Sequence, residues 1–456
     1  MTTSTGTDAA KVSEALQEEG VTAIVLYWAD NNGIVRTRLI DVQRLERVAQ
    51  RGLGASVLLA AFDSHDAVSR GYEGLSTASG DRRVVPDLGN IRQFGSQPNL
   101  AFAPVDQFRA DGTRSEYDSR HALQRQLHRS TSRGIEFLVG YELEFNLFLI
   151  DELTPAHQGP AYSALALSAL GDFPTDLLEA FSRTGINADQ FHAEYGDGQL
   201  EVSLAASDPL QAADDHLLAR HLIHSVARKH GFRASFAPLT SVERVGNGAH
   251  VHISPWHGGV NLLAPTRGDS DIYGIGREGS HFLAGLLREV SALTAIGAPS
   301  APSLRRLQPG YFAGSYTFWG IENRDAVLRL AEGGELLGDA YWNVEFRASD
   351  ASGNPYLTLA AMISAGLAGL DESLVLPAPI TDDPDQWTEE KRKSRAVSAL
   401  PFSPEAAETA IDASTPVSSI FTPEHREAFR VVRASDAQWA SERNDERIIA
   451  GHLWRY

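Results

Sequence analysis

The chain of 456 residues contains no cysteine, and its 59 acidic residues against 40 basic ones give a formal net charge of −19. This charge argues against nucleic acid or an anionic membrane as a general partner, and the missing cysteines exclude disulfides and Cys-ligated zinc. The polar N-terminus and the lack of any apolar run of about 18 residues predict a cytoplasmic protein without a membrane span.

The first part of the chain predicts a small strand-rich domain. The sequence Asp30-Asn31-Asn32-Gly33 separates two apolar segments, which is typical of a β-hairpin. A polar, glycine-containing stretch at 64–82 predicts a long loop. The expected elements are a helix at 10–20, strands at 22–28, 34–42, 84–86 and 100–104, and helical spacing near 42–51.

The longer remainder predicts a mixture of helices and strands. The turn Asp111-Gly112 marks the domain boundary, so the expected domains are 1–112 and 113–456. Pro, Arg and Gly residues at 299–314 predict a loop. The expected helices are 119–134, 173–185, 208–230, 281–296 and 356–370, and the expected strands are 135–147, 234–239, 249–254 and 340–348.

The segment 135–147 alternates between apolar and polar residues, which predicts a strand buried on one face. Glu142 and Glu144 share its polar face, roughly 6.5–7 Å apart at two residues' rise. No basic residue of the same segment neutralises them. A solvated outer face is the common explanation for such a pair, and a cation site is the alternative.

Two further segments combine glycines with possible metal ligands. Glu194 and Glu201 flank a glycine-rich turn and can face one point, although acidic surface loops have the same composition. His250, His252 and Ser254 share one face of a strand that follows another glycine-rich turn. A single strand histidine is more often structural than a ligand, but two on one face strengthen the case for a metal or phosphate contact.

Arginines and a fifth carboxylate complete the set of polar residues. An arginine-rich stretch contains Arg305, Arg306, Arg324 and Arg329, for which plain surface arginines are the alternative explanation. Glu345 and Arg347 share one strand face. Carboxylates with few histidines and no cysteines favour Mg²⁺ or Mn²⁺ over zinc. Metal ions opposite arginines suit phosphoryl transfer. A P-loop is excluded because the chain has no Gly-x-x-x-x-Gly-Lys-Ser/Thr sequence.

The order and spacing of these motifs resemble the glutamine synthetase superfamily, in its bacterial class-I type, over nearly the whole chain. The matching segments are Glu142-x-Glu144, Glu194 with Gly198-Gln199-x-Glu201, Gly246 to His252, Arg306 to Tyr311, Asn323-Arg324, Glu345-x-Arg347, Asn354 to Leu357, and Phe62-Asp63-Ser64. The resemblance implies an α+β fold: an N-terminal β-grasp domain, then a larger α/β catalytic domain with a curved antiparallel sheet. It also implies a homo-oligomer, a dodecamer of two hexameric rings with active sites between subunits.

The resemblance further implies a role for each site residue. Two to three Mg²⁺ or Mn²⁺ ions per active site are implied, one held by Glu144, Glu194 and Glu201, and another by Glu142, His250 and Glu345. The resemblance implies ATP and phosphate contacts for His252, Ser254, Arg324 and Arg329, and glutamate contacts for Gly246, Arg306 and Arg347. It implies catalysis for Asp63, Arg324 and Arg347. Asp63 would also bind the amine, and in the family this aspartate reaches an adjacent subunit.

Reaction chemistry also follows from the resemblance. The substrates would be ATP, L-glutamate and an amine: ATP phosphorylates the γ-carboxylate of glutamate, and the amine then attacks the γ-glutamyl phosphate. All residues implied for the first step are present. A non-catalytic member of the superfamily would be expected to have lost some of the metal carboxylates, and none is lost.

Two departures from the family pattern bear on the choice of amine. Ammonia-using members have a glutamate where this chain has Phe312, and an asparagine where it has Val245. A phenylalanine cannot accept a proton, but an apolar wall suits the carbon skeleton of an organic amine. We therefore expect a ligase for ethanolamine, another monoamine or a polyamine, with glutamine synthetase as the alternative. A polyamine would want a second acidic contact, for which Asp66 and Glu73 are candidates.

Overall fold

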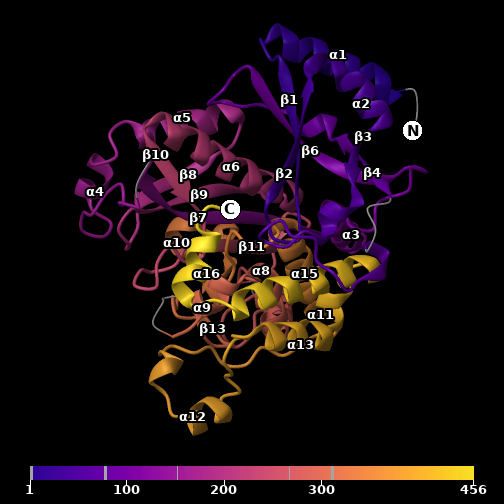
Figure 1. Ribbon diagram of the computed structural model, residues 1–456. Helices are drawn as coiled ribbons and strands as arrows, with labels where there is room; N and C mark the ends of the chain where they lie inside the picture. The colour runs from indigo at the N-terminus through magenta and orange to yellow at the C-terminus, as the bar shows by residue number, and fades with distance from the viewer. Residues whose placement is uncertain (1–3, 76–79, 151–152, 266–267, 310–312) are drawn as a thin grey trace.

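A computed structural model describes residues 4–75, 80–150, 153–265, 268–309 and 313–456 (Figure 1). Two β-sheets organise this part of the chain: a smaller one near the N-terminus and a larger one that begins at residue 135. Each sheet has its own hydrophobic core. The α+β class, the β-grasp-like N-terminal sheet and the curved, mostly antiparallel catalytic sheet are confirmed.

The N-terminal sheet has the strand order β2-β1-β6-β4-β3, with β5 beside β6. β1 and β6 run parallel, and the other pairs are antiparallel. The expected hairpin turn is confirmed, because Asp30 Oδ1 accepts hydrogen bonds from the amides of Asn32 and Ile34. The elements of this region are α1 (Ser4–Glu18), β1 (Ala23–Ala29), β2 (Val35–Asp41), η1 (Val42–Arg44), α2 (Leu45–Arg51), β3 (Leu53–Ser56), η2 (Val57–Ala61), η3 (Glu73–Leu75), β4 (Asp81–Pro86), η4 (Leu88–Asn90), β5 (Arg92–Gln93) and β6 (Leu100–Arg109).

The catalytic sheet has the strand order β13-β14-β15-β11-β7-β9-β8, with β10 paired to β7 and β12 to β11. All pairs are antiparallel except β13 with β14. The long strand β7 is central, because it pairs with three others. The strands are β7 (Ile135–Leu149), β8 (Ala188–Ala193), β9 (Gln199–Ser207), β10 (Phe232–Ser235), β11 (Ala249–His257), β12 (Val260–Asn261), β13 (Trp319–Ile321), β14 (Leu328–Ala331) and β15 (Asn343–Phe346).

Helices pack around this sheet. In the view of Figure 1, α5 and α6 lie above β7, and α8, α11 and α15 lie below it. α6 and α11 also contact each other. α11 is buried along most of its length and packs on α3 and α7. The remaining helical elements are α3 (Ser119–Thr131), α4 (Ala164–Ser168), α5 (Phe173–Thr184), α6 (Pro209–Lys229), α7 (Arg277–Arg288), α8 (Val290–Gly297), α9 (Ala301–Arg306), α10 (Gly334–Leu337), η5 (Asp339–Tyr341), α11 (Pro355–Asp371), η6 (Pro384–Gln386), α12 (Glu389–Ser394), α13 (Pro404–Ala413), α14 (Thr415–Ser418), α15 (Pro423–Ser441) and α16 (Asp445–His452).

A buried arginine ties the N-terminal sheet to the catalytic part. Arg120 of α3 lies 2.9 Å from Asp214 of α6, 2.7 Å from Asp87 and 2.9 Å from Asp106. A buried cation needs such partners, because an unpaired charge in the interior is strongly destabilising. The domain boundary at residue 112 remains a prediction; it lies between β6 and α3.

Some sequence expectations need correction. The segment 299–314 was expected to be a loop, but Ala301–Arg306 forms α9. Ser300 caps this helix by accepting from the amide of Ser303, and Pro302 is compatible with a first helical turn. The expected helix at 281–296 is divided into α7 and α8 at Glu289, and the strands expected at 234–239 and 340–348 are shorter.

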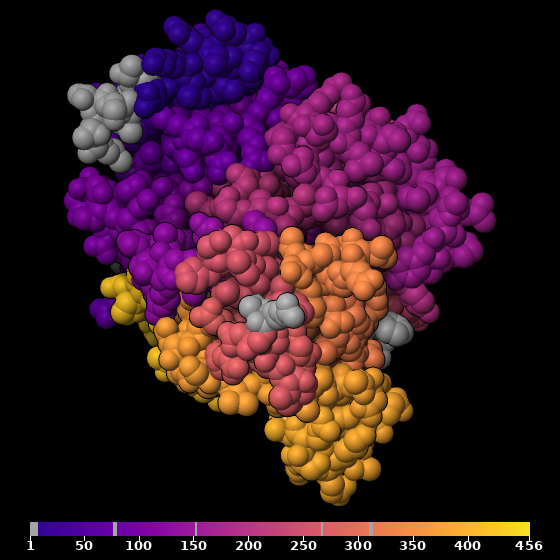
Figure 2. Space-filling model, turned by 180° about the vertical axis from the view of Figure 1, so that it is seen from behind, coloured from indigo at the N-terminus to yellow at the C-terminus, as the bar shows by residue number. Residues whose placement is uncertain are grey.

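The segment around α12 projects from the rest of the molecule in Figure 1, and Figure 2 shows the same projection from behind. A small separate apolar cluster anchors it, in which Ile380, Trp387 and Val397 pack with Phe318 and Ala326. Within the described ranges, no helix is long and apolar enough to cross a membrane.

Packing beneath β7 yields a stability prediction. Leu143 is fully buried, whereas Leu138 on the same strand is 39% exposed. We expect Leu143→Ala to lower the free energy of unfolding by about 2–5 kcal/mol, because it leaves a cavity in the core. Chemical denaturation at one fixed protein concentration measures this loss, and Leu138→Ala should change the value by only about 0.5 kcal/mol. Equal effects of the two substitutions would contradict the assignment of the buried face.

The buried His425 of α15 predicts loss of stability in acid. Its ring lies 2.9 Å from Asn31 Oδ1, and burial, reinforced by Arg82 and Arg125, lowers its pKa to about 3. The unfolded chain, with a His pKa of about 6.5, therefore takes up this proton first, and stability falls as the pH drops below 6.5. At pH 5 this group alone should cost about 2 kcal/mol. His425→Gln should flatten the pH dependence of the unfolding free energy between pH 7 and 5, and parallel curves would contradict it.

Candidate active site

The polar face of β7 becomes a site because of its strand register. His250 of β11 lies opposite Glu142, and Glu201 of β9 lies opposite Glu144. One strand further, His252 of β11 lies opposite Glu345 of β15. Side chains of opposed residues point to the same face of a sheet, so these groups gather above four neighbouring strands, β9, β7, β11 and β15.

The two histidines contact the carboxylates directly. His250 Nδ1 lies 3.2 Å from Glu142 Oε2 and 3.5 Å from Glu345 Oε1, while its Nε2 lies 3.7 Å from Glu144 Oε1. His252 Nε2 lies 3.3 Å from Glu142 Oε1. The solvated-face interpretation of the Glu142/Glu144 pair is therefore wrong: both carboxylates face a polar cluster of the protein.

The turn between β8 and β9 brings a second acidic group to the same region. His192 Nε2 lies 2.8 Å from Glu194 Oε1 and 3.8 Å from Glu201 Oε1. The hydroxyl of Tyr162 donates to the other Glu194 oxygen at 2.8 Å, and the Tyr162 ring stacks on His192 at 5.9 Å between centroids. Neither Tyr162 nor His192 was expected to be a site residue. Tyr162 reaches β8 only through the fold of the loop 155–162.

At this site, three groups of side chains place potential ligand atoms within 4.8 Å of one another. All six expected metal ligands lie in this region, but the groups differ from the expected ones: His252 and His192 take part, and Glu144 belongs to none of the groups. Each group contains two carboxylates and one histidine, and carboxylate oxygens are the ligands that suit Mg²⁺ or Mn²⁺. The groups are Glu142, Glu201 and His250; Glu142, His252 and Glu345; and His192, Glu194 and Glu201.

Crowding of carboxylates shifts their protonation. Burial raises the pKa of Glu201 to about 10, and repulsion from Glu142 and Glu144 adds to this. Burial would also raise the pKa of Glu142, but the hydrogen bonds from His250 and His252 hold it well below its usual range. A divalent cation would compete with the Glu201 proton and relieve the repulsion.

Arginines face the carboxylates across a cavity of about 570 Å³. Arg306 is 2% exposed and donates to the carbonyls of Ala348 and Ser349 at 2.5 and 3.0 Å. Gly246 packs so tightly on Arg306 that a Cβ atom would lie 2.4 Å from its side chain, so this close approach requires glycine. The cavity lining is Glu142, Glu144, Tyr162, Gln190, His192, Glu194, Tyr195, Gln199, Glu201, Val245, Gly246, His250, Arg306, Ala313, Arg324, Asp325 and Arg347.

Glu345 connects the cavity to further arginines. Arg329 Nη1 lies 3.1 Å from Glu345 Oε2, and Arg347 donates to the other oxygen. Burial would raise the pKa of Glu345, but Arg347 and the two histidines lower it to about 2. Ser254 lies further along β11, buried, where its hydroxyl accepts from Trp256 at 2.9 Å. It does not line the cavity.

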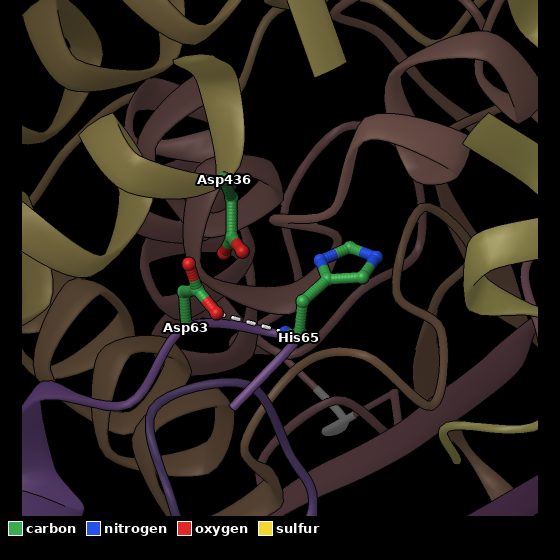
Figure 3. A group of neighbouring side chains, drawn as sticks. All are labelled: Asp63, His65 and Asp436. Atoms are coloured by element: carbon green, nitrogen blue, oxygen red, sulfur yellow. Dashed lines mark hydrogen bonds between the residues drawn. The ribbon is translucent and has the colours of Figure 1, made fainter. Parts of the chain in front are cut away.

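The two remaining expected site residues are Phe312 and Asp63. Phe312 falls outside the described residues. Asp63 is 2% exposed and does not line the cavity of its own chain. Its carboxylate accepts from the amides of His65 and Ala67 at 2.9 Å and from the Ser435 hydroxyl at 2.8 Å, and Figure 3 shows the bond to the His65 amide.

Asp63, His65 and Asp436 also place potential ligand atoms within 4.8 Å (Figure 3). Protein groups already contact both carboxylates. Asp436 Oδ1 accepts from the amide and hydroxyl of Ser64 at 2.8 and 2.6 Å, and Asp436 Oδ2 lies 3.0 Å from Arg433 without a hydrogen bond. This cluster therefore stabilises the packing of the loop on α15.

A buried amide network supports the base of the cavity. Gln199 Nε2 donates to Asn247 Oδ1 at 3.1 Å, and Asn247 Nδ2 donates to Asn146 Oδ1 at 2.9 Å. Glu144 accepts from the amide of Gly248 at 2.7 Å. Asn247 was missed in the sequence, although its place between two glycines beside the histidines was a usable signal.

Comparisons with known proteins agree with this geometry. The sequence profile of the glutamine synthetase catalytic domain matches residues 116–448. The chain is 36% identical over 453 residues to a γ-glutamylpolyamine synthetase, GlnA3 of Streptomyces coelicolor, covering 98% of this chain and 96% of that protein. It is 31% identical over 396 residues to the glutamine synthetase of Clostridium saccharobutylicum, covering 85% of each.

Solved structures show the same likeness. The crystal structure of a novel glutamine synthase homolog matches with a TM-score of 0.84 at 26% sequence identity, covering 96% of this chain and 99% of the other. The chain therefore belongs to the glutamine synthetase family, and it is a ligase. This family uses ATP and a divalent metal ion.

Metal binding can be tested at β7. We expect Glu142→Gln to weaken Mn²⁺ binding about tenfold or more, because Glu142 takes part in two of the three ligand groups. Isothermal titration of the whole protein with Mn²⁺ measures the affinity. Glu136→Gln is the matched control, since Glu136 is exposed on the same face of the same strand. Equal affinity of the Glu142→Gln variant and the wild type would contradict the assignment.

Proposed function

We propose that this ligase joins the γ-carboxylate of L-glutamate to an organic amine in a reaction driven by ATP. The observation that carries the proposal is one cavity that is lined by four glutamates and His250 together with Arg306, Arg324 and Arg347. Such an arrangement fits a substrate with several negative charges, held between bound cations and arginines.

In the first step, a γ-carboxylate oxygen of glutamate attacks the γ-phosphorus of ATP, and ADP leaves. We assign Glu142, His250 and Glu345 to one Mg²⁺ or Mn²⁺ ion. Glu144, Glu194 and Glu201 are assigned to another. The bound ions would neutralise phosphate oxygens. His252, Ser254, Arg324 and Arg329 are proposed to contact ATP and its phosphates, and Gly246, Arg306 and Arg347 are proposed to contact glutamate.

In the second step, the amine nitrogen attacks the γ-carbonyl carbon, phosphate leaves, and the nitrogen loses a proton. Tyr162 and Tyr195 are each 62% exposed at the cavity beside Glu194. Aromatic faces next to a carboxylate suit an organic ammonium ion. Phe312 replaces the glutamate of ammonia-using relatives. These features support an organic amine over ammonia.

Assembly and the second candidate function complete the proposal. Asp63 is proposed to serve the site of an adjacent subunit in a dodecamer, since it does not line the cavity of its own chain. Residue 112 is proposed as the boundary between the two domains.

The second candidate function is glutamine synthesis from ammonia, which is favoured by the likeness to relatives named glutamine synthetase.

An amine panel tests the choice of substrate. We expect phosphate release from ATP with Mg²⁺ and glutamate to be stimulated at least tenfold more by an organic amine than by ammonium at equal concentrations. Ammonium, ethanolamine, n-butylamine, putrescine and spermidine form the panel. Stimulation by ammonium as strong as by any organic amine would favour glutamine synthesis instead.

Phe312→Glu provides the companion variant in the same panel. Because the new carboxylate can accept a proton and attract ammonium, the ratio of ammonium to organic-amine activity should rise. An unchanged ratio would show that position 312 does not select the amine.

A further inference from the structure

A diamine or polyamine carries a second ammonium group that a monoamine lacks, and a selective site needs a carboxylate for it. The two carboxylates named from the sequence, Asp66 and Glu73, do not offer this contact at the cavity of their own chain. The Asp66 carboxylate already forms two ion pairs, at 2.7 Å from Arg36 and 2.8 Å from Arg455. Glu73 lies in η3, and neither residue lines the cavity.

Asp325 is a different carboxylate that does line the cavity. It follows Arg324 in the turn between β13 and β14, and its amide donates to Asn323 Oδ1 at 2.9 Å. The next residue, Ala326, is fully buried. The hydrogen bond to Asn323 and the buried Ala326 therefore fix the backbone at position 325, while the Asp325 side chain remains exposed.

The other carboxylates of the cavity already have protein partners. Glu142 contacts two histidines, Glu144 accepts from an amide, and Glu194 accepts from a tyrosine. Among the described residues, the Asp325 carboxylate accepts no hydrogen bond and has no basic nitrogen within 4.0 Å. It also belongs to none of the metal-ligand groups found there.

A negative charge at this place opposes the proposed chemistry unless a cation accompanies it. ATP and glutamate are anionic, so a carboxylate without a partner repels them. The partial burial of the Asp325 carboxylate and the neighbouring Asp383 raise the pKa of Asp325, while Arg347 offsets part of this effect. An ammonium group beside Asp325 would relieve these repulsions.

We propose that Asp325 binds the second ammonium group of a diamine or polyamine substrate, an inference that rests on the proposed function. The first amino group attacks the γ-glutamyl phosphate, and the chain of methylene groups spans the cavity. Val245 and Ala313 provide apolar lining for that chain. Val245 is one of the departures from the family pattern, so an uncharged, apolar wall and an additional carboxylate occur in the same cavity.

Putrescine and n-butylamine test this proposal, because they share a four-carbon chain and differ in the second amino group. We expect the wild type to use putrescine with at least a tenfold higher kcat/KM than n-butylamine. Asp325→Asn should lower kcat/KM for putrescine about tenfold, mainly through KM, and change that for n-butylamine less than twofold. Activity with n-butylamine also reports that the variant is folded.

Asp189→Asn is the matched control. It removes one negative charge from an exposed residue of β8, next to Gln190 of the cavity, but Asp189 itself does not line the cavity. This variant should retain the preference for putrescine. A similar loss in both variants would show a general effect of net charge and would overturn the role of Asp325.

The remaining outcomes separate the two proposals. No preference of the wild type for putrescine, or equal losses for both amines in Asp325→Asn, would overturn this inference and leave the amine ligase intact. Failure of every amine and of ammonium to stimulate phosphate release in the wild type would instead overturn the proposed function.

Discussion

The register of β7 with β9 and β11 is the constraint on which the site depends. It sets Glu142 opposite His250 and Glu144 opposite Glu201. A slip of one residue would turn every one of these side chains to the other face of the sheet. The buried Leu143 and Phe145 on the reverse face prevent such a slip, since they would then be exposed. Ordinary apolar packing therefore positions the charged groups.

Gathering so many carboxylates is unfavourable by itself, and the protein offsets the repulsion in two ways. Histidines lie between the carboxylates, and Arg329 and Arg347 each contact one oxygen of Glu345. Burial and the acidic neighbours also raise the pKa of Glu201, which favours its neutral form over a further negative charge. The cluster is thus prepared for cations, although the chain as a whole carries a charge of −19.

The two halves of the proposed reaction rest on different kinds of structure. Phosphoryl transfer would use side chains on paired strands, whose positions are fixed by the sheet. The amine would meet residues in loops and turns, including Tyr162 and Asp325. Loops tolerate substitution better than paired strands do, so relatives with one phosphoryl chemistry can differ in the amine they use.

Local patterns in the sequence determined much of the fold. Alternation predicted β7 and its carboxylate face, turn chemistry predicted the first hairpin, and the residue types predicted hard cations rather than zinc. Helix spacing located α3, α6 and α11 to within a few residues. These features depend on neighbours in the chain, which periodicity and turn preferences report directly. The loop expected at 299–314 failed because Ser300 and Pro302 begin a short helix there.

Only the tertiary structure decided which groups share the cavity. Glu142 and His250 are 108 residues apart, and no local pattern determines the pairing of their strands. Tyr162 and Asp325 lack any periodic signal and enter the cavity only because their loops fold over it. Asp63 shows the converse: its motif was recognised in the sequence, but packing against Ser435 buries it away from the cavity of its own chain. The sequence alone thus determined the chemical groups, and long-range strand and loop contacts determined their arrangement.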